Sequence, residues 1–184
     1  AAREDETGRA GYNIALSDDA VKRINHCREY LDKKMENAGR PIYGVTTGFG
    51  SLCNISVDKD NLSQLQKNLM MSHACGTGQR VPKEIARLML LLKVQSLSYG
   101  HSGVQLITVQ RLVDMFNSNI IPVVYEQGSL GASGDLSPLA HMCLPLIGLG
   151  EVEVDGNIIS GEELMKRMGY RVRSEERRVG KECR

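Results

Sequence analysis

The sequence predicts a mainly α-helical fold with a short β-hairpin near its C-terminal end. Four segments between residues 18 and 119 carry apolar residues at helical spacing, bounded by residues that favour the start or end of a helix. The later segment 151–160 instead alternates polar and apolar residues, and it contains Asp155-Gly156, a dipeptide typical of two-residue hairpin turns. Helices are therefore expected to be the main elements.

The first helix is expected from about residue 18 to residue 37. Ser17 is its predicted N-cap, and two aspartates follow it, where negative charge interacts well with the helix dipole. Gly-Arg-Pro at 39–41 ends the helix. The segment 41–56 is expected to be a loop with a small amount of extended structure.

The second and third helices frame a glycine-rich connection. Asp58 is the predicted cap of the second helix, which ends near the glycines of residues 76–78, so His73 is expected at or just past its end. Pro82 is predicted in the first turn of a third helix that runs through Tyr99. This helix is apolar nearly all round and is therefore expected to be buried.

Two further helices follow. The fourth is expected from about Val104 to Asn119. Ser137 and Pro138 are the predicted cap and first turn of the fifth. Within the fifth helix, Pro145 predicts a kink or an early stop.

The chain is expected to form one domain, residues 12–172, which closes with a short helix at about 160–169. With 184 residues, 41% of them hydrophobic, it is long enough to bury one core. Residues 1–11 are polar and small, and residues 173–184 are charged at most positions, so both ends are expected to be loosely ordered. The tail from Ser174 resembles translated sequence that is foreign to the protein.

Composition excludes several classes of protein. The net charge is +1, which gives no electrostatic basis for binding nucleic acid or an anionic membrane. The apolar runs are too short to cross a bilayer, and no signal peptide opens the chain, so an intracellular protein is expected. Five cysteines without CxxC spacing argue against a disulfide framework and favour the reducing cytoplasm.

Metal and nucleotide sites are not expected. The sequence contains two His-x-Cys pairs, at 73–75 and 141–143. A step of two residues in a helix turns the side chains to opposite faces, so neither pair can chelate a metal ion if it is helical. The Gly-Phe-Gly of residues 48–50 lacks the third glycine and the βαβ unit of a dinucleotide-binding motif.

Residues 131–134, Gly-Ala-Ser-Gly, lie between a strand-like stretch and a predicted helix start. In a strained turn, the amide nitrogen of Gly134 can attack the carbonyl of Ala132, and loss of two waters leaves an unsaturated five-membered ring. Glycine offers no side chain to block this approach. The Ser133 hydroxyl leaves as one of these two waters, and its elimination gives an electrophilic methylidene. For so short a pattern, a flexible turn before a capped helix is the alternative interpretation.

The surroundings of this turn favour the chemical interpretation. The stretch GSLGASGDLSPLAHM, residues 128–142, resembles the signature of the aromatic amino acid ammonia-lyases, a family that contains histidine, phenylalanine and tyrosine ammonia-lyases and related aminomutases. The segments YGVTTGFG (43–50), SHACGTG (72–78) and LLKVQSLSYGHSGV (91–104) resemble three further family motifs in the same order. The resemblance covers residues 42–156.

The resemblance implies both a fold and a prosthetic group. The fold is the N-terminal helical domain of the fumarase/aspartase-like ammonia-lyase fold. The family residues that match Ala132, Ser133 and Gly134 form a methylidene-imidazolone autocatalytically, so no external cofactor is implied. Tyr43 matches the inner-loop tyrosine assigned as the base. Asp135 is expected to help orient the cyclising loop, and the helix that follows is expected to enhance the electrophilicity of the ring.

Substrate choice is predicted from Ser72 and His73. Histidine lyases tend to carry Ser-His at this position, whereas phenylalanine and tyrosine lyases carry His-Leu or Phe-Leu. A polar His73 in the pocket can hydrogen-bond an imidazole, so L-histidine is the expected substrate. The alternative is that His73 only satisfies the C-terminus of a helix.

Length is the main departure from the family. Its members are more than twice as long, and their later residues complete an active site shared among the subunits of a homotetramer. This chain alone is therefore expected to be inactive. Three alternatives remain open for the whole protein: a phenylalanine or tyrosine lyase, an aminomutase of the same family, and a non-catalytic helical interaction domain.

Overall fold

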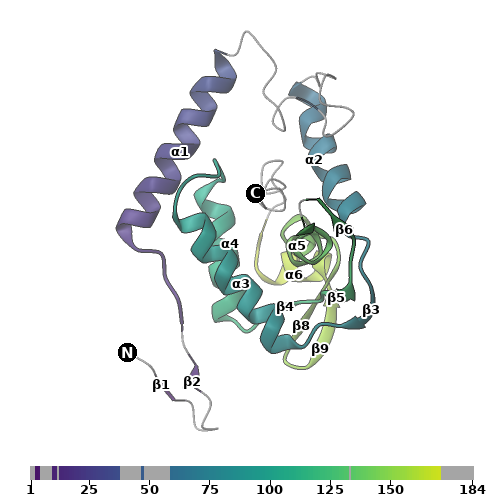
Figure 1. Cartoon of the computed structure of the whole chain (residues 1–184). Coiled ribbons are helices and arrows are strands. Elements are labelled where there is room, and N and C mark those ends of the chain that lie inside the picture. The colour runs from purple at the N-terminus through teal and green to yellow at the C-terminus, as the bar shows by residue number, and fades with distance from the viewer. Residues whose placement is uncertain are drawn as a thin grey trace.

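The structure of the chain is a computed structural model that describes residues 3–4, 10–11, 13–37, 47, 59–132 and 134–170. Of the residues named above, Tyr43, Asp58, Ser133 and Ser174 lie outside these ranges, as do most of the predicted loop 41–56 and the tail 173–184. Helices predominate in the described part of the chain, and the hairpin near its C-terminal end is present (Figure 1). The mainly α fold class is therefore confirmed.

The first helix, α1 (Asp18–Glu36), begins where the sequence predicts. Its N-cap Ser17 accepts a hydrogen bond at Oγ from the backbone nitrogen of Ala20, at 3.2 Å. This bond satisfies one of the amides that the first turn leaves without a helical partner. The buried side chains of α1 are Ala20 and Ile24, so the helix packs through a narrow face against α3 and α4 (Figure 1).

The other helix boundaries fall close to the predicted ones. The second helix, α2 (Lys59–His73), ends on His73 itself. The third, α3 (Lys83–Ser98), begins one residue after Pro82, which occupies the N-cap rather than the predicted first turn. The fourth, α4 (Leu106–Asn117), lies just inside its predicted bounds.

The core forms where α3 and α4 pack against each other and against the C-terminal third of the chain. Burying a large apolar side chain stabilises the fold by roughly 1.5–3 kcal/mol, so this layer supplies much of the stability. The largest fully buried side chains are Ile24, Leu90, Leu97, Val109, Leu112, Met115, Val124, Met142, Leu146, Val152 and Leu164.

The prediction that α3 is buried is correct for only one face of the helix. Leu90 and Leu97 are 0% and 1% exposed, but Leu88 and Leu92 on the other face are 50% and 58% exposed. The neighbouring elements cover one face of α3. An apolar sequence indicates that a helix can be buried, but the number of elements that surround it depends on the tertiary arrangement.

Short strands build one three-stranded sheet and several pairs. The antiparallel sheet has the order β4 (Ile121–Pro122), β8 (Glu151–Val154), β9 (Asn157–Ser160). The turn between β8 and β9 is Asp155-Gly156, so the predicted hairpin is confirmed. The antiparallel pairs are β1 (Arg3–Glu4) with β2 (Ala10–Gly11), β3 (Thr77–Arg80) with β5 (Tyr125–Gln127), and β6 (Leu130–Gly131) with β7 (Gly134–Asp135).

The fifth helix, α5 (Ser137–Cys143), starts differently from the prediction. Its N-cap is Leu136, and Ser137 is the first helical residue instead of the cap. The backbone N–H of Ser137 donates to Oδ1 of Asp135 at 3.0 Å. A side chain two residues upstream therefore satisfies this amide, and the hydroxyl of Ser137 is not used as a cap.

The end of α5 and the last helix agree with the sequence. After α5, the chain continues into a short 3₁₀ helix, Leu144–Ile147, which contains Pro145, so the predicted early stop is confirmed. The last helix, α6 (Gly161–Arg167), begins after Ser160, whose Oγ accepts the N–H of Glu163 at 3.2 Å.

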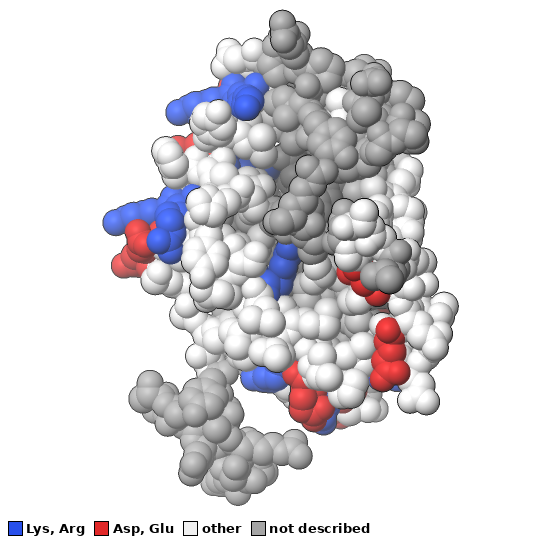
Figure 2. All heavy atoms as spheres, viewed as in Figure 1, with Lys and Arg blue, Asp and Glu red and all other residues white. Residues whose placement is uncertain are grey.

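Charged side chains lie in small groups of both signs on the face shown in Figure 2. No patch of a single sign dominates that face, in keeping with a net charge of +1. Among the residues that the structure describes, no helix is long and apolar enough to cross a membrane.

Candidate active site

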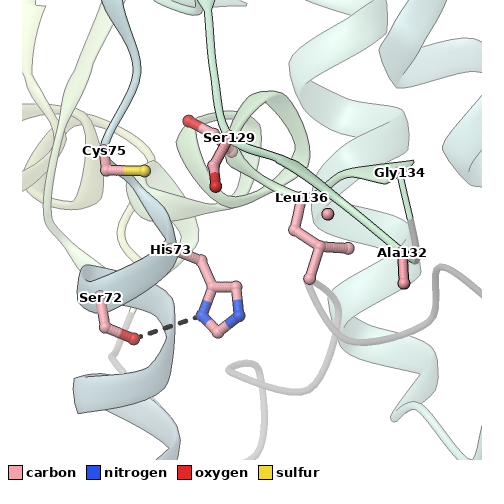
Figure 3. A pocket seen from close by; sticks show the side chains of 9 residues that line it. Ser72, His73, Cys75, Ser129, Ala132, Gly134 and Leu136 are labelled. Atoms are coloured by element: carbon pink, nitrogen blue, oxygen red, sulfur yellow. Dashed lines mark hydrogen bonds between the residues drawn. The ribbon is translucent and has the colours of Figure 1, made fainter.

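A pocket of about 290 Å³ lies between the end of α2 and the segment that contains the Gly-Ala-Ser-Gly motif (Figure 3). The two stretches are far apart in sequence, but α2 packs against α5, which follows the motif directly. The pocket is lined by Ser72, His73, Cys75, Ser129, Gly131, Ala132, Gly134, Leu136 and Ser137.

His73 is held at the last turn of α2 by its own helix. Its Nδ1 lies 2.8 Å from the carbonyl oxygen of Leu69 and 3.2 Å from Oγ of Ser72. A carbonyl oxygen can only accept, so Nδ1 carries the proton and Nε2 of the neutral ring is an acceptor. Figure 3 shows the ring projecting from α2 toward the side of the pocket where Leu136 and Ala132 lie.

Ser72 supports this arrangement. Its hydroxyl donates to the same Leu69 carbonyl at 2.8 Å. Both side chains therefore bind a carbonyl that the end of the helix leaves without an amide donor. The helix-capping role considered for His73 is thus present, and it engages one ring nitrogen. Within the described part of the chain, no hydrogen bond engages the other nitrogen.

The motif itself is the tip of a tight hairpin. In the pair of β6 and β7, Leu130 lies opposite Asp135 and Gly131 opposite Gly134, which leaves two residues for the turn. Gly134 has φ of +88°, a conformation that costs other residues roughly 1 kcal/mol or more. Ala132 and Gly134 are exposed, so this turn is accessible from the pocket.

Asp135 anchors both sides of the hairpin. Its Oδ1 accepts the backbone N–H of Ser129 at 2.9 Å and that of Ser137 at 3.0 Å. Residue 128 is glycine at the point where the chain passes this carboxylate, and a Cβ there would overlap it. The carboxylate therefore ties the strand before the turn to the helix after it.

The structure brings four of the predicted site residues to one pocket: Ser72, His73, Ala132 and Gly134. Asp135 lies just behind the turn that the pocket exposes. Tyr43 and Ser133 lie outside the described residues. The helix expected to enhance the electrophilicity of the ring is α5. It has only seven residues, so its dipole comes from few peptide units.

Sequence reasoning missed several residues that line the pocket, namely Cys75, Ser129, Leu136 and Ser137. The sequence indicates Cys75 only as a member of a His-x-Cys pair. Ser129, Leu136 and Ser137 lie within the quoted motif, but nothing in their residue types indicates which way they face. Among the described residues, no group of three or more histidine, cysteine or acidic side chains is arranged to hold a metal ion.

Comparison with known proteins finds relatives over most of the chain. The family model described as "Aromatic amino acid lyase" matches residues 5–175. The chain belongs to this family. The resemblance inferred from the four motifs is therefore confirmed for the aromatic amino acid lyases.

Curated relatives of this aromatic amino acid lyase chain include two bacterial histidine ammonia-lyases. The protein from Clostridium tetani is 47% identical over 161 residues, and the one from Symbiobacterium thermophilum is 47% identical over 163 residues. The alignments cover 88% and 89% of this chain but 31% and 32% of the relatives. The chain thus spans about a third of the length of these relatives.

Solved structures share the fold of this lyase chain. Histidine ammonia-lyase from Trypanosoma cruzi matches with a TM-score of 0.79 at 32% identity, covering 92% of this chain and 32% of that one. Phenylalanine aminomutase from Pantoea agglomerans matches with a TM-score of 0.82 at 29% identity, covering 91% and 33%. The predicted helical ammonia-lyase fold is therefore confirmed.

Proposed function

We propose that the whole protein of which this chain forms a part eliminates ammonia from L-histidine to give urocanate. One observation carries the proposal: a single pocket is lined by His73 on one side and by Ala132 and Gly134 on the other. The substrate-selecting histidine and the electrophile-forming turn of such an enzyme would need this proximity. The curated relatives named histidine ammonia-lyase support the choice of substrate.

Ala132, Ser133 and Gly134 are proposed to form the methylidene-imidazolone. The described residues fit that role, because the motif occupies a two-residue hairpin turn and Gly134 already has a positive φ. Apart from its two chain neighbours, no atom of the described residues lies within 4 Å of the position that a Cβ of Gly134 would occupy, so these residues leave space around the attacking residue. The formed group would supply an electrophile that makes the substrate amine a better leaving group.

His73 is proposed to recognise the imidazole of the substrate. Because its Nδ1–H donates to the Leu69 carbonyl, its Nε2 can accept the N–H of a bound imidazole. A phenylalanine substrate has no such donor and would leave Nε2 desolvated and unpaired, which costs binding free energy. The hydrogen bonds at Leu69 and Ser72 fix the ring before the substrate arrives.

Tyr43 is proposed as the base that removes the substrate β-proton. A free phenol has a pKa of about 10, so this role requires neighbours that lower the pKa of Tyr43. Replacing Tyr43 by Phe removes only the hydroxyl. In the full-length protein, we expect this change to lower kcat steeply with little effect on thermal stability. Unchanged turnover would remove Tyr43 from the mechanism.

The deciding experiment measures kcat/KM of the full-length protein for histidine, phenylalanine and tyrosine. We expect a clear preference for histidine, which His73→Leu reduces by about tenfold or more while the melting temperature changes little. His101→Leu, at an exposed histidine in the connection between α3 and α4, is the matched control and should leave turnover unchanged. A preference of the parent protein for phenylalanine would refute the proposal.

An aminomutase is the second candidate, because solved structures of phenylalanine and tyrosine aminomutases match this chain with TM-scores of 0.82 and 0.80. An aminomutase returns ammonia to the β-carbon. Analysis of the same reaction mixtures for products separates the candidates: urocanate indicates the lyase, and a β-amino acid indicates the mutase. Absence of turnover with all three amino acids would favour a non-catalytic helical domain.

The full-length protein is further proposed to be a homotetramer, as the family resemblance implies. Its proposed ligand is a small amino acid substrate. Light scattering of the purified protein measures its mass in solution. A monomer would contradict this part of the proposal.

A further inference from the structure

A hydrogen bond joins the two sides of the candidate pocket behind the residues that line it. His141 lies on α5, and its Nε2 accepts the backbone N–H of Gly76 at 3.0 Å. Gly76 follows His73 by three residues, in the connection from α2 to β3. The bond therefore ties the segment that carries His73 to the helix that follows the Gly-Ala-Ser-Gly turn.

The contact leaves little room for a side chain at residue 76. A Cβ on Gly76 would lie 3.0 Å from Nε2 of His141 and 3.0 Å from Oγ of Ser137. Both atoms belong to one face of α5, at positions four residues apart. The backbone of residue 76 thus lies directly on α5, and a larger residue there would have to displace the side chains of His141 and Ser137 by a few tenths of an ångström.

Neighbouring groups fix the orientation of the His141 ring. The Tyr125 ring meets it edge-on, with centroids 5.2 Å apart and an interplanar angle of 73°. Because a backbone N–H can only donate, Nε2 must carry the lone pair, and the neutral ring holds its proton on Nδ1. Burial lowers the pKa of His141 below its ordinary value of 6.5, which favours this neutral acceptor form.

Continuous contacts link the turn to His73. Asp135, at the end of the hairpin, accepts the N–H of Ser137, the first residue of α5. One turn further along α5, His141 accepts the N–H of Gly76. The short helix α5 thus connects the two sides of the pocket, with a hydrogen bond at each end.

We propose that His141 is a positioning residue: by accepting the Gly76 N–H, it fixes residues 72–76 and thereby sets the distance of His73 from the Ala132–Gly134 turn. The catalytic effect of this positioning rests on the proposed function, in which His73 binds the imidazole of a substrate held at that turn. A shift of about 1 Å would lengthen a hydrogen bond of about 2.9 Å beyond the distance at which such bonds form, so it would weaken the binding of the substrate imidazole.

The test uses the full-length protein with three substitutions. His141→Leu removes the acceptor, whereas His141→Gln keeps an acceptor at a similar reach. Met142→Ala removes a neighbouring side chain of α5 that is 0% exposed and lies in the core, so it controls for general loss of stability.

The first measurement is hydrogen exchange of the peptide that spans residues 74–80, read by mass spectrometry. We expect His141→Leu to accelerate exchange there by about tenfold, and His141→Gln to restore most of the protection. Met142→Ala should not accelerate this peptide more than it accelerates peptides of α3 and α4. Unchanged exchange in His141→Leu would overturn the proposal, whether or not the protein turns over histidine.

The second measurement separates KM from kcat for histidine. We expect His141→Leu to raise KM by about tenfold, with a smaller effect on kcat and partial rescue by His141→Gln. A faster exchange with an unchanged KM would show that the hydrogen bond orders the segment without positioning His73. A parent protein that exchanges as expected but does not turn over histidine would refute the proposed function alone.

Discussion

At the scale of single residues, the candidate site depends on two side chains that accept hydrogen bonds but do not line the pocket, Asp135 and His141. Asp135 holds the amides of Ser129 and Ser137, and His141 holds the amide of Gly76. The sequence motifs predict a role for Asp135 in orienting the loop. They indicate His141 only as part of a His-x-Cys pair that is not expected to bind a metal ion. The difference arises because Asp135 acts on neighbours in sequence, whereas the partner of His141 is 65 residues away.

Removing the Asp135 carboxylate is expected to loosen the hairpin. Asp135→Ala leaves the amides of Ser129 and Ser137 without this acceptor, whereas Asp135→Asn keeps a neutral one. In the full-length protein, we expect the fraction of chains that have lost two waters to fall strongly in the alanine variant and less in the asparagine variant. Mass spectrometry of the peptide containing residues 129–137 measures it. Equal fractions in parent and alanine variant would contradict this role.

The depressed pKa of His141 predicts a dependence of stability on pH. In the unfolded chain this ring titrates near its ordinary value of 6.5, and in the folded protein below it. Between the folded and the unfolded pKa of His141, the unfolded state therefore binds more protons than the folded state. The contribution of His141 to the free energy of unfolding is thus complete above pH 6.5 and is lost as the pH falls through the folded pKa.

We expect the free energy of unfolding, measured with denaturant, to fall between about pH 8 and about pH 5.5. This fall should be smaller in His141→Gln than in the parent protein. The other histidines are present in both proteins and cancel in the comparison. An identical pH dependence in both would indicate that His141 titrates normally in the folded protein.

At the scale of elements, α3 shows how one helix serves two environments. Its inner face carries Leu90 and Leu97 into the core, and its outer face exposes Ile85, Leu88 and Leu92. Because apolar residues occur nearly all round the helix, the sequence pattern does not indicate which face is buried. Stability should therefore respond very differently to the same substitution on the two faces.

Leu90→Ala is expected to lower the free energy of unfolding by about 2–5 kcal/mol, because it leaves a cavity in the packed core. Leu88→Ala on the half-exposed face should cost less than about 1 kcal/mol. Chemical denaturation of the two variants measures both values. Similar losses would mean that the outer face of α3 is covered in the protein studied.

At the scale of the whole molecule, the chain is much shorter than its relatives. It spans 31% to 32% of the curated relatives named above. It nevertheless contains the turn, the segment of His73 and the helix that links them. The described residues thus include Ala132 and Gly134 of the proposed ring-forming motif, and they line the pocket on both sides.

The 184-residue chain alone is expected neither to release ammonia from histidine nor to cyclise its motif appreciably. Compressing the turn of residues 131–134 stores strain of about 1–3 kcal/mol, which surrounding packing must offset. The exposed apolar face of α3 should also promote association, which light scattering measures.

Intact mass and urocanate absorbance test the two parts separately. A loss of two waters that Ser133→Ala abolishes would show that the local turn suffices for cyclisation. Urocanate formation by this chain would show that no other part of the protein is required for turnover.

The sequence by itself determined the local elements. Ser17 and Ser160 cap helices, Asp155-Gly156 turns a hairpin and Pro145 ends a helix, because each acts through bonds or steric limits within a few residues. The four motifs also identified the family, since their order and residue types are present in the chain before it folds.

Only the tertiary structure decided which of these elements meet. It placed His73 opposite Ala132 and Gly134, exposed one face of α3, and seated the backbone of Gly76 on His141. These features depend on contacts between residues far apart in the chain, and burial is a property of the neighbours that surround a side chain. Residue type and spacing along one segment do not specify those neighbours.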